Sequence, residues 1–191
     1  AAPAQIGMFE TPGTTYHIVI SGNDAYVADR YSVRVLDVSV PTGITERSLV
    51  HIPAFWSVGG NGDYGVFMDY TKLNVINLTD PGNPVVVAQL QVSSAWQDYG
   101  MEVAGNYAYV AGSTDGLYVI DISNPGSPAQ VGFFGATYSM RELDVVGHYA
   151  YVLSYPTALH IIDIANPQSP VEVGSYTPAS GSLSALTVAN D

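Results

Sequence analysis

Apolar and polar residues alternate along this chain in short runs that follow one another in a fixed order. The clearest unit begins at Met101, turns at Gly105 and Asn106, and continues through residues 107–112 and, after a gap, 116–125. Period-two alternation is the signal of a half-buried β-strand. The unit predicts four strands, over residues 100–104, 107–112, 117–122 and 129–134, and no segment of the chain shows the period of a helix.

The same unit occurs four times. An Asp or Asn near the end of the third predicted strand marks each copy, at Asp37, Asn77, Asp121 and Asp163, so the steps are 40, 44 and 42 residues. A fixed period of this length indicates a solenoid, a propeller or an array, and four antiparallel strands per repeat make one propeller blade. We therefore expect an all-β protein: a β-propeller, or propeller arc, of four four-stranded antiparallel blades with an extra strand at each end.

The repeat boundaries divide a single repeat domain, residues 1–191, into six parts. We expect a lone outer strand and link over 1–15, blade 1 over 16–55, blade 2 over 56–98, blade 3 over 99–140, blade 4 over 141–183, and the first strand of a fifth blade over 184–191. Blade 2 departs most from the pattern, because its first turn is longer and Asn77 replaces the repeated Asp.

Two runs of residues carry a resemblance to a known family. One is the run that ends in the repeated Asp, at 33–37, 117–121 and 159–163, and the other is the Gly-Asn/His-Tyr-Ala-Tyr-Val run at 105–110 and 147–152. Together they resemble the LVIVD repeat of bacterial and archaeal surface propellers, and the resemblance covers almost the whole chain. It implies a propeller fold and an extracellular or cell-surface location, and it implies no particular activity.

The two ends of the sequence match the interior of the repeat. Residues 3–9 match 128–134 almost one for one, which predicts an outer strand with no third strand before it, and residues 186–191 match 143–148, which predicts a first strand. Unpaired sheet edges invite pairing. Three arrangements stay open: part of a longer propeller, an arc completed head to tail by another copy, or a compact four-bladed ring. The apolar residues expected to mediate assembly are Ile6, Met8, Phe9, Leu186 and Val188.

The composition narrows the classes of partner. Charged residues make up 12% of the chain and the net charge is −12, with only five scattered basic residues. This charge disfavours nucleic acid and anionic membranes as partners. No apolar stretch is long enough to span a membrane. The absence of cysteine excludes disulfides and thiolate metal sites.

Motifs for catalysis or for bound groups are missing. The repeated Asp residues lie in different blades, so we expect each side chain to hold its adjacent loop rather than to form a metal site. The four histidines lack zinc-ligand spacing, no nucleophile elbow is present, and the glycines lie in hairpins rather than before helices. We predict no enzyme activity, no metal and no cofactor.

The loops that precede the first strand of each blade carry the most unusual side chains. In a propeller these loops gather at one mouth of the central channel, where aromatic and charged groups can bind a sugar or peptide; packing between blades is the alternative. The candidate ligand-binding residues are Trp56, Trp96, Asp98, Tyr99, Tyr138, Arg141 and Glu142.

The sequence as a whole favours a non-enzymatic structural or interaction propeller of an extracellular or cell-surface protein. Its expected partners are other copies of itself or the rest of a longer propeller, reached through the terminal strands. A ligand- or glycan-binding module that uses one mouth of the channel is the alternative.

Overall fold

The computed structural model describes residues 2–29, 31–52, 58–60, 63–69, 71–92, 99–112 and 114–188. Throughout these residues the regular elements are strands, and they form four antiparallel four-stranded sheets. Because these described segments contain no long apolar helix, they offer no helical membrane span. The expected all-β blade architecture is confirmed.

Each sheet is one repeat, with its strands hydrogen-bonded in chain order. Blade 1 contains β1 (Thr15–Ser21), β2 (Asp24–Asp29), β3 (Ser32–Asp37) and β4 (Thr45–Val50). Blade 2 contains β5 (Val58–Gly60), β6 (Tyr64–Met68), β7 (Lys72–Asn77) and β8 (Val85–Gln91). Blade 3 contains β9 (Tyr99–Ala104), β10 (Tyr107–Gly112), β11 (Gly116–Asp121) and β12 (Ala129–Gly135). Blade 4 contains β13 (Ser139–Val146), β14 (Tyr149–Tyr155), β15 (Ala158–Asp163) and β16 (Val171–Tyr176).

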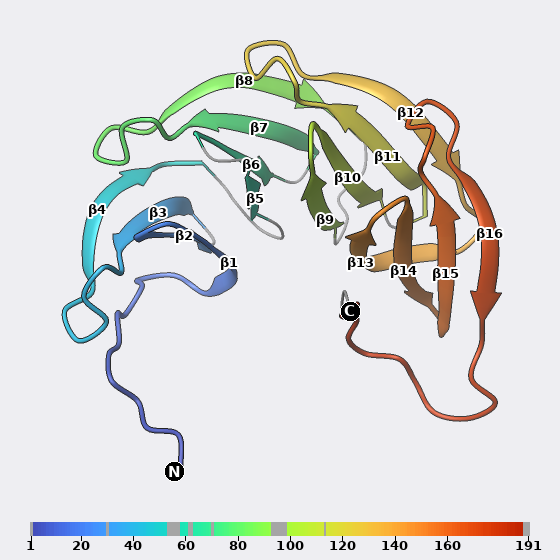
Figure 1. Ribbon diagram of the computed structural model, residues 1–191, viewed down its shortest axis with the longest axis horizontal. Coiled ribbons are helices and arrows are strands. Elements are labelled where there is room, and N and C mark those ends of the chain that lie inside the picture. The colour runs from blue at the N-terminus through green and yellow to red at the C-terminus, as the bar shows by residue number, and fades with distance from the viewer. Residues whose placement is uncertain are drawn as a thin grey trace.

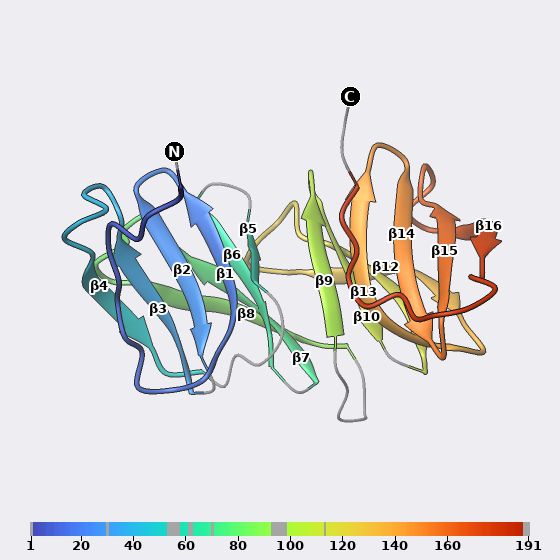
Figure 2. The same cartoon turned by 90° about the horizontal axis from the view of Figure 1, so that it is seen from below.

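The blades stand side by side in an open arc (Figure 1). The first strand of each blade lies on the inside of the arc and the fourth on the outside, and the opening lies between blade 1 and blade 4. Both ends of the chain run into this opening, as the view from below also shows (Figure 2). The four blades therefore form an arc and not a compact closed ring.

Local chemistry explains the turns inside each blade. Gly22, Gly105 and Gly147 have φ values of 59°, 58° and 61° at the first hairpin turn, a left-handed conformation that costs glycine little. The repeated Asp holds the turn after the third strand, as expected: the Oδ1 atoms of Asp121 and Asp163 accept backbone N–H bonds of 2.8 Å each from the residue two positions later.

A β-bulge recurs between the third and fourth strands of every blade. The pairing register shifts at equivalent points, between Val35 and Leu36, Val75 and Ile76, Val119 and Ile120, and Ile161 and Ile162. A bulge adds one residue to one strand and re-aims the side chains beyond it. This feature was not predicted, and it decides which residues of the outer strand face the next blade.

The hydrophobic core lies between the blades. One apolar cluster joins blades 1 and 2, a second joins blades 2 and 3, and a third joins blades 3 and 4. In the third cluster Tyr109, Leu117 and Val119 of blade 3 pack with Leu143 and Val152 of blade 4. Blades 2 and 3 thus each pack on a blade on both faces, whereas blades 1 and 4 each pack on one neighbouring blade.

The two predicted terminal strands are not formed. Residues 3–9 and 184–188 run along the arc without joining any strand ladder among the described residues, while 189–191 lie outside them. A strand needs a hydrogen-bonded neighbour, and for residues 3–9 that neighbour would be the third strand of a preceding blade. The structure thus shows no strand at residues 3–9 or 184–188, and the assignment of these segments to neighbouring blades stays a prediction.

Candidate functional site

The structure describes the side chains of three of the seven predicted ligand-binding residues. Trp56, Trp96 and Asp98 lie outside the described residues, and Tyr99 is described only as part of the backbone of β9. Tyr138 stacks on His160 of blade 4, whereas the exposed Arg141 and Glu142 line a cavity. The predicted grouping of all seven residues therefore stays a prediction.

Tyr138 belongs to a polar network within blade 4. Its ring stacks on His160, with centroids 3.7 Å apart and planes 11° apart, and its hydroxyl donates to Glu172 Oε2 at 2.7 Å. Burial, followed by the hydrogen bond to Glu172 and its charge, raises the pKa of the Tyr138 hydroxyl. Tyr138 is thus a neutral donor that fixes the Glu172 carboxylate.

The same network continues across three strands. Ser154 Oγ lies 2.9 Å from His160 Nε2, and His160 Nδ1 lies 3.1 Å from Glu172 Oε1. Burial alone would raise the pKa of Glu172, but the hydrogen bonds from Tyr138 and His160 and the charge of His160 outweigh it and lower that pKa. We call Ser154, His160 and Glu172 the blade 4 network.

A hydroxyl, an imidazole and a carboxylate in this order are also the parts of a nucleophilic relay. Two observations favour a structural role. Ser154 and His160 are only 6% and 7% exposed, so a substrate would have little access to either. The same repeat positions in blade 1 hold Asp29, Arg34 and Glu46, so neither a hydroxyl nor an imidazole occupies them.

This blade 1 network is ionic. Arg34 Nε donates to Asp29 Oδ2 at 2.6 Å, and its Nη1 donates to Glu46 Oε2. Tyr31 N–H and Ser32 Oγ donate to Asp29 Oδ1 at 2.9 and 2.8 Å. Burial would raise the pKa of Asp29, but these hydrogen bonds and the Arg34 charge outweigh it and lower that pKa.

Blades 2 and 3 place other polar groups at the corresponding point of the third strand. Asn74 accepts a 2.7 Å bond from Gln89 Nε2, and Tyr118 donates to Asp115 at 3.0 Å. The position three residues before the repeated Asp is therefore Arg, Asn, Tyr or His in a strand that is otherwise apolar. Sequence reasoning missed these networks, although that polar interruption was the available signal.

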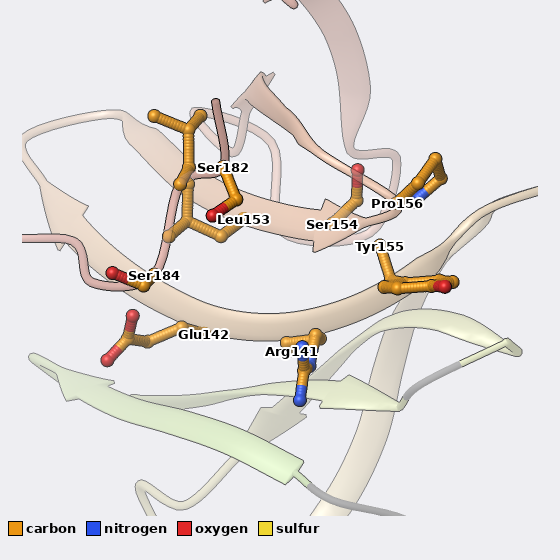
Figure 3. A pocket seen from close by; sticks show the side chains of 9 residues that line it. Arg141, Glu142, Leu153, Ser154, Tyr155, Pro156, Ser182 and Ser184 are labelled. Atoms are coloured by element: carbon orange, nitrogen blue, oxygen red, sulfur yellow. The ribbon is translucent and has the colours of Figure 1, made fainter. Parts of the chain in front are cut away.

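A cavity of about 550 Å³ lies at blade 4 beneath the C-terminal segment. Arg141 and Glu142 line it together with residues 153–156 and 182–184. Figure 3 shows Tyr155 and Pro156 at one end of the cavity and Glu142 and Ser184 at the other. The lining combines one cation, one anion, several hydroxyls and an apolar wall.

The predicted assembly residues divide into exposed and packed groups. Ile6 and Met8 are each 66% exposed, whereas Phe9 packs with Ala25, Val27 and Leu36 of blade 1. At the other end Leu186 and Val188 are half-buried, and the Val188 N–H donates to Asp144 Oδ2 at 2.7 Å. Both terminal segments are thus anchored on the neighbouring blade.

The acidic residues suggest no metal centre. Among the described residues, no group of three or more His, Asp or Glu side chains is arranged to hold an ion.

Glu102 and Asp144 lie on adjacent inner strands, where burial first and the charge of Asp144 second raise the pKa of Glu102.

Comparison with known proteins identifies the family of this chain. The LVIVD repeat model matches residues 12–51, 100–134 and 139–178, which is more than half of the chain. The chain belongs to the LVIVD repeat family. The unmatched stretch includes blade 2, the repeat with the weakest pattern. A search of curated proteins found no match.

Two solved structures share the fold. A functionally unknown protein from Desulfotomaculum acetoxidans matches 89% of this chain with a TM-score of 0.75 at 13% identity, and the match covers 58% of that protein. A protein from Lactobacillus plantarum matches 87% of this chain with a TM-score of 0.71 at 17% identity, and 59% of it is covered. The LVIVD chain therefore spans a little under three fifths of each of these longer chains.

Proposed function

We propose that this LVIVD chain is a non-enzymatic structural and interaction module of an extracellular or cell-surface protein, and that the outer face of blade 4 packs against a further repeat blade. The low content of charged residues and the absence of cysteine are compatible with an exported protein. The polar networks lie within single blades, and in blade 4 the hydroxyl and imidazole groups of Ser154 and His160 are buried.

The outer face of blade 4 carries this proposal. Blade 3 buries Tyr109, Leu117 and Val119 against blade 4, and the matching residues of blade 4 are again apolar. On that face, however, the outer-strand residues Val173 and Tyr176 remain 56% and 61% exposed. A face with the composition of an interior interface but with exposed side chains is a binding surface.

Gly174 supports the same conclusion by close approach. Its counterpart Gly132 lies against blade 4 so tightly that a Cβ would be 1.9 Å from the carbonyl oxygen of Pro167. At Gly174 a Cβ would meet only Ile161 Cδ1, at 3.9 Å. Gly174 thus has the small size that close contact with the turn of a following blade requires. No such turn lies beside it among the described residues.

An added blade tests the proposal. Residues 189–191 are replaced by a second copy of residues 146–178, which continues the repeat in phase, and thermal unfolding is followed by calorimetry. We expect the midpoint to rise by about 3 °C or more, because apolar area is buried on blade 4.

The control places Gly174→Ala in both backgrounds. The substitution should be nearly neutral in the unextended chain and should remove most of the gain in the extended chain, where the new Cβ meets the added proline carbonyl. An extended chain that unfolds at the original temperature would contradict the proposal.

The cavity favours a second candidate function, the binding of a small polar ligand such as a sugar. Its volume lies in the range of ligand pockets, and Arg141, Glu142 and three serine hydroxyls offer hydrogen-bond donors and acceptors. A glycan array followed by calorimetric titration tests it. Binding that is lost in Arg141→Ala and retained in Arg47→Ala supports this function, and silence across the array opposes it.

A further inference from the structure

Asn77 of blade 2 stands where the other three blades hold the repeated Asp, and it keeps the same turn. Its Oδ1 atom accepts hydrogen bonds from the Thr79 N–H at 2.9 Å and from the Thr79 hydroxyl at 2.7 Å. In blade 1 the Oδ1 atom of Asp37 accepts the same pair of bonds from Ser39. One oxygen is therefore sufficient for the turn.

The replacement of Asp by Asn changes only the second atom of the side chain. A backbone N–H can only donate, so the Asn77 atom that contacts the Thr79 N–H is the amide oxygen. The second atom is then the amide nitrogen Nδ2, which takes the place of the second carboxylate oxygen in the other blades.

The surroundings of this second atom differ between blades 1 and 2. In blade 1 the Oδ2 atom of Asp37 accepts a 2.7 Å hydrogen bond from Arg47, the extra residue of the bulge in β4, whose side chain is 39% exposed. In blade 2 the extra residue of the bulge is Val87, which is also 39% exposed. By repeat equivalence, Asn77 Nδ2 lies on the side of an exposed apolar residue that offers it no acceptor.

The chain around Asn77 is anchored by one apolar side chain and is otherwise at the surface. Leu78 is 5% exposed and packs in the cluster that joins blades 1 and 2. Successive side chains of an extended chain point to opposite sides, so Asn77 and Thr79 point away from that cluster. Asn77 is half-buried, Thr79 is exposed, and Val85, the partner of Asn77 in β8, is 50% exposed.

Residues 77–79 read Asn-Leu-Thr, which is an acceptor tripeptide for N-linked glycans in exported proteins. No other Asn-x-Ser/Thr tripeptide occurs in the 191 residues. The equivalent positions in blades 1, 3 and 4 hold Asp, whose side chain has no amide nitrogen to modify. The tripeptide thus falls at the one copy of the turn that carries a modifiable nitrogen.

We infer that Asn77 is the acceptor of an N-linked glycan and that folded blade 2 accommodates the sugar beside Val85 and Val87. The donor class is an oligosaccharide joined through its anomeric carbon to a lipid pyrophosphate. A bond forms between Asn77 Nδ2 and the anomeric carbon, and the bond from that carbon to the phosphate oxygen breaks. The lipid pyrophosphate leaves with the electron pair, and an Nδ2 proton passes to a base of the transferase.

This modification rests on the exported location that forms part of the proposed function, and it adds a site that the location alone does not specify. Secretion of the full chain from a eukaryotic host cell tests it, because the host supplies both the export route and the glycan donor. We expect a chain that carries one glycan, which peptide N-glycosidase removes, leaving Asp at position 77 as the marker. Peptide mass spectrometry is applied to the secreted and the retained chain, so the result does not depend on the yield of secretion.

Two variants copy the residues of other blades and should therefore keep the turn. Asn77→Asp restores the carboxylate of blades 1, 3 and 4. Thr79→Ala reproduces Ala165 of blade 4, whose N–H alone binds Asp163 at 2.8 Å. Both variants should be secreted without a glycan, whereas Thr79→Ser, which reproduces the Ser of blades 1 and 3, should retain it.

Thermal unfolding tests whether the folded blade accommodates the sugar. The glycosylated chain and Asn77→Asp should unfold at midpoints within about 2 °C of each other, because changes at the surface have small effects on stability. A much lower midpoint for the glycosylated chain would show that Nδ2 faces the interior and would overturn the placement beside Val85 and Val87.

The remaining outcomes separate this site from the proposed function. A secreted, folded chain without a glycan at Asn77 would overturn the inference, and so would a glycan confined to the retained, unfolded chain. A glycosylated chain that gains no stability from the added blade would overturn the packing proposed for blade 4 and leave the Asn77 site in place.

Discussion

Blades 1 and 4 each contact an outer segment of nearly the same sequence, but only the segment on blade 4 is a paired strand. Blade 4 receives β12, in which Gly132 lies against Pro167 and the strand is paired with β11. Blade 1 receives residues 3–9, in which Gly7 lies against Pro41 and no third strand is paired. The difference separates two requirements. The contact of an outer segment with a blade needs only that segment and the turn between the third and fourth strands of the blade. Formation of a strand also needs a third strand that pairs with the segment.

The two blades also differ in the polar network behind that contact. Blade 1 joins its strands with two carboxylates and a permanently charged guanidinium, and blade 4 uses a hydroxyl, an imidazole and a carboxylate. In these two blades the same three repeat positions hold polar side chains of different chemistry. Removal of the central residue should therefore have unequal costs.

The largest effect is expected at Arg34. Arg34→Met leaves Asp29, which is 1% exposed, as a buried charge without its cation, and we expect unfolding free energy to fall by about 3–5 kcal/mol. His160→Leu should cost about 1–2 kcal/mol, because Glu172 keeps the Tyr138 donor and partial access to water. Urea denaturation measures both, and equal losses would contradict the distinction.

The next largest loss of stability is expected at the contact between Gly132 and Pro167. Gly132→Ala places a Cβ against the carbonyl of Pro167, and overpacking of this kind costs about 1–3 kcal/mol. The matched control is Gly126→Ala, where a Cβ meets only Asn124 Oδ1 at 3.7 Å. If the two variants were equally stable, the blade 3–blade 4 contact would not be as close as described.

Low pH should destabilise blades 1 and 4, because it protonates the carboxylates of their polar networks. The pKa values of Asp29 and Glu172 are lowered in the folded state, so their stabilisation is present above the unfolded value of about 4 and is lost as pH falls through the folded value. In Arg34→Met the pKa of Asp29 should rise, so the stabilisation that the Asp29 carboxylate provides should be lost at a higher pH. Unfolding curves between about pH 5 and pH 2 test this.

The smallest effect on global stability is expected at the contact between Gly7 and Pro41. Gly7→Ala should release residues 3–9 from Pro41 while blades 1–4 stay folded, with a change of about 0.5 kcal/mol or less. Limited proteolysis should then cut within residues 3–9 faster than in Gly43→Ala. Cooperative loss of the whole arc in Gly7→Ala would show that this segment belongs to the core.

Much of this architecture follows from short-range patterns. The third repeat was predicted to have strands at 100–104, 107–112, 117–122 and 129–134, and each observed strand lies within one residue of these limits. Period-two alternation and turn residues suffice there, because each strand pairs with its neighbour in sequence. The role of the repeated Asp followed from the same local chemistry.

The remaining features depend on non-local geometry. The His160–Glu172 contact depends on the pairing register of β15 with β16, in which Glu172 lies opposite Ile162. The cavity requires residues 182–184 to fold back over β14. The match between residues 3–9 and 128–134 indicated the docking position correctly but could not supply the absent pairing partner.

Proton–proton contacts at Gly7 test the central claim most directly. If residues 3–9 occupy the outer-strand position on blade 1, nuclear Overhauser spectra of the full chain will show cross-peaks between the Gly7 Hα protons and Pro41 or Thr42, and Phe9 ring protons will contact Val27. Random-coil shifts for residues 3–9 with none of these cross-peaks would contradict the account.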